Sequence, residues 1–350
     1  MAIREMLGTD DFPLNARLKT WRLLGKGLTP LGTTSESTTS ISSQVIDGRM
    51  WLNTVNLTAP NININLITTG MFTADELRTK VIYGGFRYKI FNKSTLSSNS
   101  DILYFGSATN MYLLTESALS STTDEVYIKF MIDVPNGVMK AWVDGVLKAT
   151  KSISSSDIST ANFVINYGCR SAPSNVAETH CYTDFYWEID DSANDGIPAG
   201  KLGPVKIRTV KTEGSVLGAG WTTTDSLSLD AVLNTPMGGT AELTPSATTS
   251  ADESVSTIGF ARPDSVLGIK AVSVSLYHYR QSGTTPVLKA QLKQGSVSKE
   301  AVLFSGLAGD LKRQRNVDSL GILNTDLNGK AWTNDSVKAL KLAVNSKTGA

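Results

Sequence analysis

Apolar and polar residues alternate between Val126 and Asp191, where VYIKFMIDVPNGVMKAWVDGVLKAT leads on to CYTDFYWEIDD. Two turn sequences, Pro135-Asn136-Gly137 and Asp144-Gly145, separate the alternating runs. A period of two that is broken by Asn-Gly and Asp-Gly pairs is typical of antiparallel hairpins, because these residues tolerate the positive φ angles of tight turns. The segment therefore predicts the centre of an antiparallel β-sandwich.

Strand-like runs recur about every ten residues on either side of this segment, a spacing that is typical of sandwiches. The predicted strands are Gln44–Ile46, Met50–Leu57, Asn61–Thr68, Lys80–Asn92, Leu103–Phe105, Met111–Leu114, Val126–Val134, Val138–Val143, Phe163–Tyr167 and Cys181–Ile189. They predict an all-β fold class, with an antiparallel jelly-roll β-sandwich over residues 41–203. A second, smaller β domain is expected over residues 204–350, and helices are expected to be few and short.

The domain boundary is predicted in Asp190–Pro204, because DDSANDGIPAGKLGP has two prolines, three glycines and no periodicity. Residues 1–40 are predicted to form an N-terminal arm or loop region, with one early helix around Leu14–Trp21. The second domain is expected to begin with a strand at Val205–Val210. Near its end we expect a capped turn or short helix at Thr333, followed by a closing strand.

Composition excludes several classes of partner. The chain has 33 Lys and Arg against 32 Asp and Glu, a net charge of +1, and no long basic run, so no nucleic acid is expected as a partner. No stretch approaches the roughly 18 apolar residues of a membrane-spanning helix, and the N-terminus has no apolar signal core. Near-neutrality is acceptable in a subunit that is held in an assembly.

The sequence offers little equipment for catalysis. Its two histidines are His180 and His278, and no Gly-x-Ser-x-Gly or phosphate-binding glycine loop is present. His180 and Cys181 are adjacent in a predicted strand, so their side chains point to opposite faces and cannot form a catalytic pair. Cys169 and Cys181 are interpreted as reduced thiols, although a bridge across their loop is geometrically conceivable. We therefore predict no enzyme activity and no cofactor.

Carboxylates in two places have the chemistry of catalytic pairs or of metal ligands. Glu125, Asp133 and Asp184 lie on predicted strands but match no paired glycosidase motif. A second group follows the last strand of the sandwich and includes the weak metal candidates Asp190, Asp191 and Asp195. Calcium prefers such oxygen-rich loops, but the run lacks the spacing of an EF-hand. A solvated acidic loop is the favoured interpretation, and no bound metal is predicted.

Aromatic residues give the candidate ligand site. Trp142, Tyr182 and Tyr186 lie on central strands, where stacked rings can form a platform for sugars. Simple alternation places Tyr182, Asp184, Tyr186 and Glu188 on one face, and Phe185 and Trp187 on the other. An amphipathic sandwich surface without a ligand explains the same pattern, so both interpretations stay open.

The order of these motifs resembles a family of phage proteins. The hairpin VYIKFMIDVPNGVMKAWVDGVLKAT with the later CYTDFYWEIDD resembles the concanavalin-A-like, laminin-G-type jelly rolls of phage virion proteins. LGPVKIRTV, Trp221, GIKAVSVSLYHYRQSG and KAWTNDSVKALKLAVNS are similar to the C-terminal part of phage structural proteins that are often labelled minor tail proteins. The resemblance covers roughly residues 120–350.

The resemblance implies a non-enzymatic virion structural protein, tail-associated or fibre-like, that is assembled in the host cytoplasm. Its implied partners are other virion proteins, further copies of itself in a homo-oligomer or multi-copy assembly, and a host-surface glycan. Two alternatives remain: a head decoration or collar protein with a mechanical role, and a carbohydrate-binding or carbohydrate-active protein outside any virus.

Overall fold

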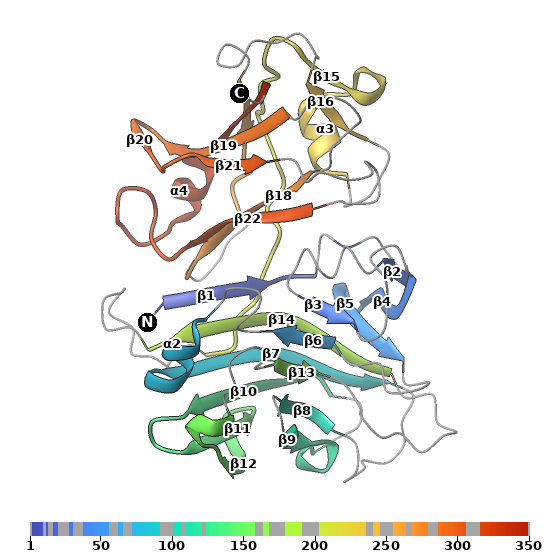
Figure 1. Cartoon of the computed structure of the whole chain (residues 1–350). Coiled ribbons are helices and arrows are strands. Elements are labelled where there is room, and N and C mark those ends of the chain that lie inside the picture. Colours follow the sequence, from blue (N-terminus) through green and yellow to red (C-terminus); the bar gives the residue numbers. More distant parts are fainter. Residues whose placement is uncertain are drawn as a thin grey trace. The chain divides into compact units, whose positions relative to one another are not determined.

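The computed structural model of the chain divides into two units, Met1–Arg208 and Thr209–Ala350 (Figure 1). The structure describes residues 2–9, 12, 17–19, 28–30, 38–55, 62–65, 72–91, 101–106, 110–120, 124–157, 164–167, 179–190, 203–235, 241–245, 255–263, 268–278, 286–305 and 316–348. Strand pairs within these residues are antiparallel, and their α-helices are short. The predicted all-β class, a sandwich followed by a smaller β domain, is confirmed.

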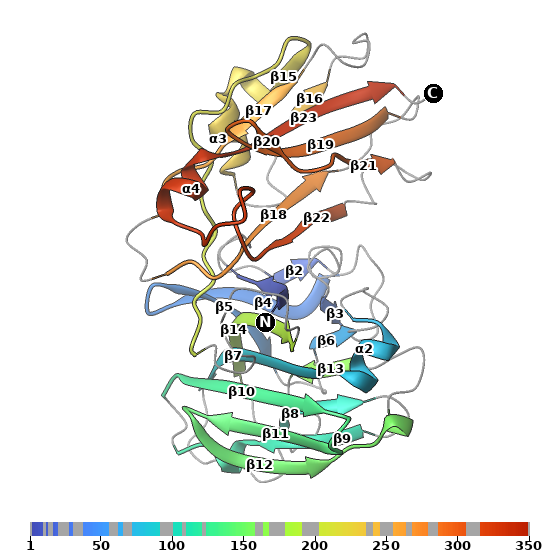
Figure 2. The same cartoon turned by 90° about the vertical axis from the view of Figure 1, so that its left-hand side faces the viewer.

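The described residues of the first unit form two sheets (Figure 2). The large sheet has the order β12–β11–β10–β7–β14–β5–β4–β2, and β1 pairs with β14. Its strands are β1 (Ala2–Leu7), β2 (Arg17–Lys19), β4 (Thr38–Ile46), β5 (Arg49–Val55), β7 (Val81–Phe91), β10 (Val126–Asp133), β11 (Val138–Val143), β12 (Val146–Ser152) and β14 (Thr179–Ile189). The small sheet, in the order β3–β6–β13–β8–β9, contains β3 (Leu28–Pro30), β6 (Ile62–Asn65), β8 (Asp101–Gly106), β9 (Asn110–Thr115) and β13 (Val164–Tyr167).

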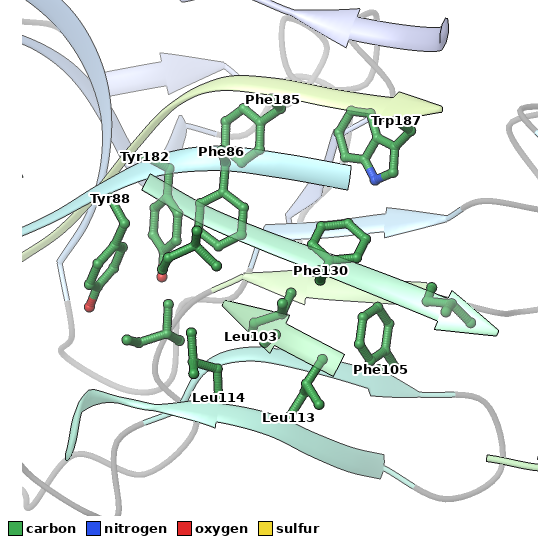
Figure 3. Close-up of a cluster of buried hydrophobic side chains, with 14 of the residues drawn as sticks. Phe86, Tyr88, Leu103, Phe105, Leu113, Leu114, Phe130, Tyr182, Phe185 and Trp187 are labelled. Carbon is green, nitrogen blue, oxygen red and sulfur yellow. The ribbon is translucent and has the colours of Figure 1, made fainter. Parts of the chain in front are cut away.

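The core of this unit lies between the two sheets (Figure 3). Phe130 of β10 meets Phe105 of β8 edge to face, with ring centroids 5.7 Å apart. Leu103 and Leu114 of the small sheet belong to the same buried cluster. We call the side of the large sheet that faces this core its inner face and the opposite side its outer face.

Local turn chemistry sets the hairpin of β11 and β12. Asp144 and Gly145 both have positive φ angles, 48° and 82°, as the predicted Asp-Gly turn requires. The Asp144 carboxylate also accepts a hydrogen bond from the Tyr127 backbone N–H at 2.9 Å, which ties the turn to β10. The strand limits predicted for β11 agree with the structure.

The N-terminal residues differ from the prediction. Ala2–Leu7 is a strand of the large sheet, paired with β14, and not part of an arm outside the sandwich. The early helix expected around Leu14–Trp21 is also wrong, because Arg17–Lys19 is β2 and pairs with β4. Burial explains both differences, since Leu7 and Leu18 are fully enclosed in the core of the first unit.

Short helices occur where side chains cap them. The α2 helix (Ala74–Thr79) begins with a capping box in which Thr73 and Glu76 bond to each other's backbone N–H. It was not predicted, although Thr73 followed three residues later by Glu76 is a readable signal. The 3₁₀ turns of this unit are η1 (Glu116–Ala118) and η2 (Ser155–Asp157).

The described residues of the second unit form three sheets. One has the order β17–β23–β19–β20 with β21 beside β19, and the other two are the antiparallel pairs β18–β22 and β15–β16. The strands are β15 (Trp221–Thr223), β16 (Leu243–Pro245), β17 (Ser256–Gly259), β18 (Val272–His278), β19 (Pro286–Gln294), β20 (Val297–Ser298), β21 (Val302–Ser305), β22 (Asn316–Leu323) and β23 (Leu340–Thr348). The helices are η3 (Thr224–Ser226), α3 (Leu229–Leu233) and α4 (Asn334–Ala339).

Two predictions for the second unit have different outcomes. The capped helix near Thr333 is confirmed, since Thr333 and Ser336 form the capping box of α4 just before the last strand. The strand expected at Val205–Val210 is wrong, because this segment joins no ladder. Its backbone instead bonds to side chains of the large sheet, as described below.

Candidate functional site

A β-bulge in β14 decides which side chains share a face. Thr183 pairs with Arg87 and Tyr186 with Gly85, so β14 has one more residue than β7 between these pairs. Asp184, within the bulge, has a left-handed φ of 56°, which Asp tolerates better than most residues. Beyond this point the alternation of β14 is shifted by one position.

The shift overturns the predicted arrangement of Tyr182 and Tyr186. Tyr182 lies on the inner face together with Phe185 and Trp187, and is fully buried in the core. Tyr186 lies on the outer face, where its hydroxyl is 2.7 Å from the hydroxyl of Tyr127. Tyr186 is also fully buried. Neither tyrosine belongs to an exposed platform, so burial removes both Tyr182 and Tyr186 from the predicted ligand site.

Trp142, the third candidate, keeps part of its side chain in solvent. Along β11 the buried Met139, Ala141 and Val143 alternate with half-buried neighbours, so Trp142 lies on the outer face. Its cross-strand neighbours are Lys129 on β10 and Leu147 on β12. The Leu147 side chain is 49% exposed, so the edge beside the indole is open to solvent.

Two further side chains, Lys140 and Tyr83, complete this surface, and sequence reasoning did not assign them to the site. Lys140 precedes Trp142 by two residues on the same face, and Tyr83 lies in the neighbouring cross-strand row. The Lys129 ammonium is 5.6 Å from the centre of the Tyr83 ring, a cation–π arrangement. The sequence did contain a signal for this pairing, because the register of a hairpin about the Pro135–Gly137 turn places Lys129 opposite Trp142. We define the Trp142 face as Trp142, Lys129, Lys140, Leu147 and Tyr83.

The middle of the outer face is covered by the segment Gly203–Ile207, which we call the strap. The strap carbonyls of Gly203 and Val205 accept hydrogen bonds from Tyr127 Oη at 3.3 Å and Arg87 Nε at 3.4 Å. The Ile207 N–H donates to Asp184 Oδ1 at 2.9 Å. These contacts explain why the strap is extended without pairing to a strand.

Gly85 provides the space for the paired tyrosines. A Cβ atom at this position would lie 2.5 Å from Tyr127 Oη and 2.6 Å from Tyr186 Cε1. Burial is the main cause that raises the pKa of Tyr127 and of Tyr186. Both phenols therefore stay protonated at neutral pH and serve as hydrogen-bonding groups instead of bases.

The carboxylates that were considered as catalytic groups have structural partners. Glu125 Oε1 is 2.6 Å from a guanidinium nitrogen of both Arg49 and Arg87. Asp184 holds the strap and lies 3.4 Å from Arg87 Nε. Asp133 accepts hydrogen bonds from the backbone and side-chain amides of Asn136. Each of the three carboxylates thus fixes a turn, a strap or a pair of arginines.

His180 and Cys181 point in opposite directions, as predicted. His180 Nδ1 is 2.6 Å from the Tyr88 hydroxyl, and its Nε2 is 3.6 Å from Glu116 Oε1, all within the core. The Cys181 thiol donates to Asn53 Oδ1 at 2.9 Å. Burial raises its pKa, and the nearby Lys89 lowers it by less. Cys169 lies outside the described residues, and the side chain of His278 does as well.

The metal candidates form no site within the described part of the chain. Asp190 follows β14, is exposed and donates its N–H to the Val81 carbonyl. Asp191 and Asp195 lie outside the described residues. Among the residues that the structure describes, no group of three His, Cys, Asp or Glu side chains is arranged to hold a metal ion. In the same residues, no helix combines the length and apolar character of a membrane span.

Comparison with known proteins gives only remote likenesses. No family model and no curated protein matches the chain. Among solved structures, alginate lyase Aly36B is 8% identical with a TM-score of 0.37 and covers 52% of this chain and 95% of its own. An alginate lyase from Corynebacterium sp. is 12% identical with a TM-score of 0.33, covering 46% and 86%. The CBM22 tandem domain of Paenibacillus barcinonensis Xyn10C is 10% identical with a TM-score of 0.29, covering 100% and 91%. At such identities and TM-scores, none of these likenesses bears on the function of this chain.

Proposed function

We propose that this protein is a non-enzymatic β-sandwich protein that contacts carbohydrate through the Trp142 face. The partial exposure of Trp142 on the outer face carries the proposal, because Tyr182 and Tyr186 are fully buried. An indole that lies on a sheet offers its apolar ring to the C–H face of a sugar. The neighbouring Lys140 supplies hydrogen-bond donors for sugar hydroxyls.

The contacts of the carboxylates support a binding role over catalysis. Glycosidases need two carboxyl groups on either side of the bond that is cleaved. Here Asp133 and Asp184 are both almost fully buried and are engaged with Asn136 and with the strap. Release of reducing sugar by the purified protein, lost on Asp133→Asn or Asp184→Asn, would contradict the non-enzymatic proposal.

A glycan array with full-length protein tests the binding proposal. Trp142→Ala is expected to weaken binding at least about tenfold, the loss typical of a central aromatic anchor. Val45→Ala serves as the matched control, because Val45 is a 41% exposed apolar residue on β4 of the same sheet. Equal binding by Trp142→Ala and the control, with both variants folded by circular dichroism, would refute a role for the Trp142 face.

We also propose that the protein is carried on a phage particle, either on the tail or as a head decoration or collar component. This proposal rests on the ordered sequence motifs between residues 120 and 350. Many copies on one particle would convert weak single-site glycan binding into useful adhesion, and their arrangement would follow the symmetry of the particle. Mass spectrometry of purified particles, followed by antibody labelling in electron micrographs, distinguishes tail from head. Absence from the particles would contradict the proposal.

A further inference from the structure

Lysines are concentrated on the flank of the large sheet that contains Trp142. Strands β10, β11 and β12 together contain four of them, Lys129, Lys140, Lys148 and Lys151, whereas β11 and β12 contain no Asp or Glu. The whole chain carries a net charge of only +1, so this is a local excess. Strands β11 and β12 are therefore locally basic although the protein is nearly neutral.

The position of two of these lysines relative to the indole is specific. Lys129 lies directly across from Trp142 on β10, and Lys140 lies two residues before it on β11. Neighbours of these two kinds on one sheet face are separated by about 5–7 Å. Lys148, at the β11–β12 bulge, is exposed beside Leu147. A ring that stacks on the indole would thus have Lys140 beside it on β11, whereas the Lys129 ammonium lies against the Tyr83 ring.

Burial raises the pKa of Tyr83, and the charges of Asp190, Asp133 and Glu188 raise it further, so the nearby carboxylates lie toward the Tyr83 end of the face. Asp133, the one acid of β10, accepts three hydrogen bonds from Asn136. Asp144 accepts from the Tyr127 backbone N–H in the hairpin turn. Glu188 is fully buried in β14. Within the described residues, no carboxylate forms an ion pair with Lys140. Its charge is available to a ligand.

We infer that the Trp142 face selects an anionic glycan: a pyranose ring lies against the Trp142 indole and its acidic substituent pairs with Lys140. The inference rests on the proposed function and specifies its ligand class. A lysine ammonium is a compact point charge without the fixed fork of an arginine. The face is therefore expected to accept a carboxylate or a sulfate at a suitable position on the ring.

Matched polymers test this inference. Polygalacturonate and its methyl ester have the same backbone but differ in charge, and dextran sulfate and dextran form a second pair. We expect full-length protein to bind each charged polymer at least about tenfold more tightly than its uncharged partner at 50 mM NaCl, with the difference reduced at 300 mM as screening increases. Lys140→Gln should weaken binding of the charged polymers several-fold, while Lys206→Gln, an exposed lysine of the strap, should not.

The outcomes separate the inference from the proposed function. If uncharged polymers bind as well as charged ones and Trp142→Ala abolishes both, the anionic preference is overturned while glycan binding stands. If charged polymers bind but Trp142→Ala has no effect, the attraction is general and the inference fails. If no glycan binds at either salt concentration, the proposed function fails with it. Lys140→Arg retains the charge and should restore binding if the charge is responsible.

Discussion

Substitution of Asp184 tests how strongly the strap, Gly203–Ile207, is attached to the outer face of the large sheet. The Asp184 carboxylate is 3% exposed, accepts the Ile207 N–H at 2.9 Å and lies 3.4 Å from Arg87 Nε. A hydrogen bond to a charged group contributes about 1.5–3 kcal/mol. In Asp184→Ala this contact is lost, and the strap should open about ten- to a hundredfold more often, since 1.4 kcal/mol corresponds to a factor of ten.

The backbone at Asp184 adds a second, separable cost. Alanine in the left-handed region, where Asp184 has a φ of 56°, costs about 1–2 kcal/mol. Asp184→Gly removes the same contact without that strain. The Gly and Ala variants should therefore release the strap equally, but the Gly variant should unfold at a higher urea concentration than the Ala variant. Asp184→Asn keeps an acceptor and tolerates the conformation, and should show the smallest change.

Limited trypsin digestion reports on strap opening, because Lys206 and Arg208 are exposed residues at which trypsin can cleave once the backbone is released. We expect cleavage after these residues to be fastest in Asp184→Ala and Asp184→Gly. Urea unfolding of the same variants reports the cost of strain. Cleavage of Asp184→Ala at the wild-type rate, or an Asn variant as labile as the Ala variant, would refute the reasoning.

Three other predictions concern packing, pH and thiol chemistry. In Gly84→Ala the new Cβ would overlap the Phe130 ring, so the free energy of unfolding should fall by about 1–3 kcal/mol. Adding Phe130→Leu to Gly84→Ala should recover part of this loss, and a double variant whose loss equals the sum of the two single losses would contradict the overlap. Burial raises the pKa of Asp326, but hydrogen bonds led by the Lys330 N–H outweigh it and leave the pKa lowered. The Asp326 carboxylate should therefore stabilise the second unit above about pH 4, and this contribution should be lost as the pH falls through the lowered folded-state pKa. The urea midpoints at pH 7 and pH 3 should differ less in Asp326→Asn than in the wild type, and an equal difference in both proteins would refute this role of Asp326. Because burial raises the pKa of Cys181, a Cys169→Ser chain should react slowly with Ellman's reagent when folded and rapidly in guanidinium; rapid reaction of the folded chain would be the contrary result.

Local signals in the sequence predicted the hairpins well. The Asp144-Gly145 turn and the alternation on either side of it predicted the limits of β11 from neighbouring residues alone. The capping box at Thr333 likewise marks the last helix. Each of these features depends on contacts within a few residues, which a sequence pattern records directly.

Features that depend on distant residues were not predictable. The bulge at Asp184 exists because β14 must match β7, about 100 residues earlier in the chain, and a carboxylate at this point holds the strap. Strict alternation therefore assigned Tyr186 to the wrong group of neighbours. Similarly, Val205 and Ile207 alternate like a strand, but their backbone partners are side chains of the large sheet.

The most direct test of the account is the response of the tryptophan indole signals to a glycan. In ¹⁵N-labelled protein, addition of polygalacturonate should move the indole N–H resonance of Trp142, assigned with Trp142→Phe. The resonances of Trp51 and Trp187, which are 1% exposed, should stay in place. A Trp142 resonance that does not move at saturating glycan, or an equal shift of all indole signals, would contradict glycan contact through the Trp142 face.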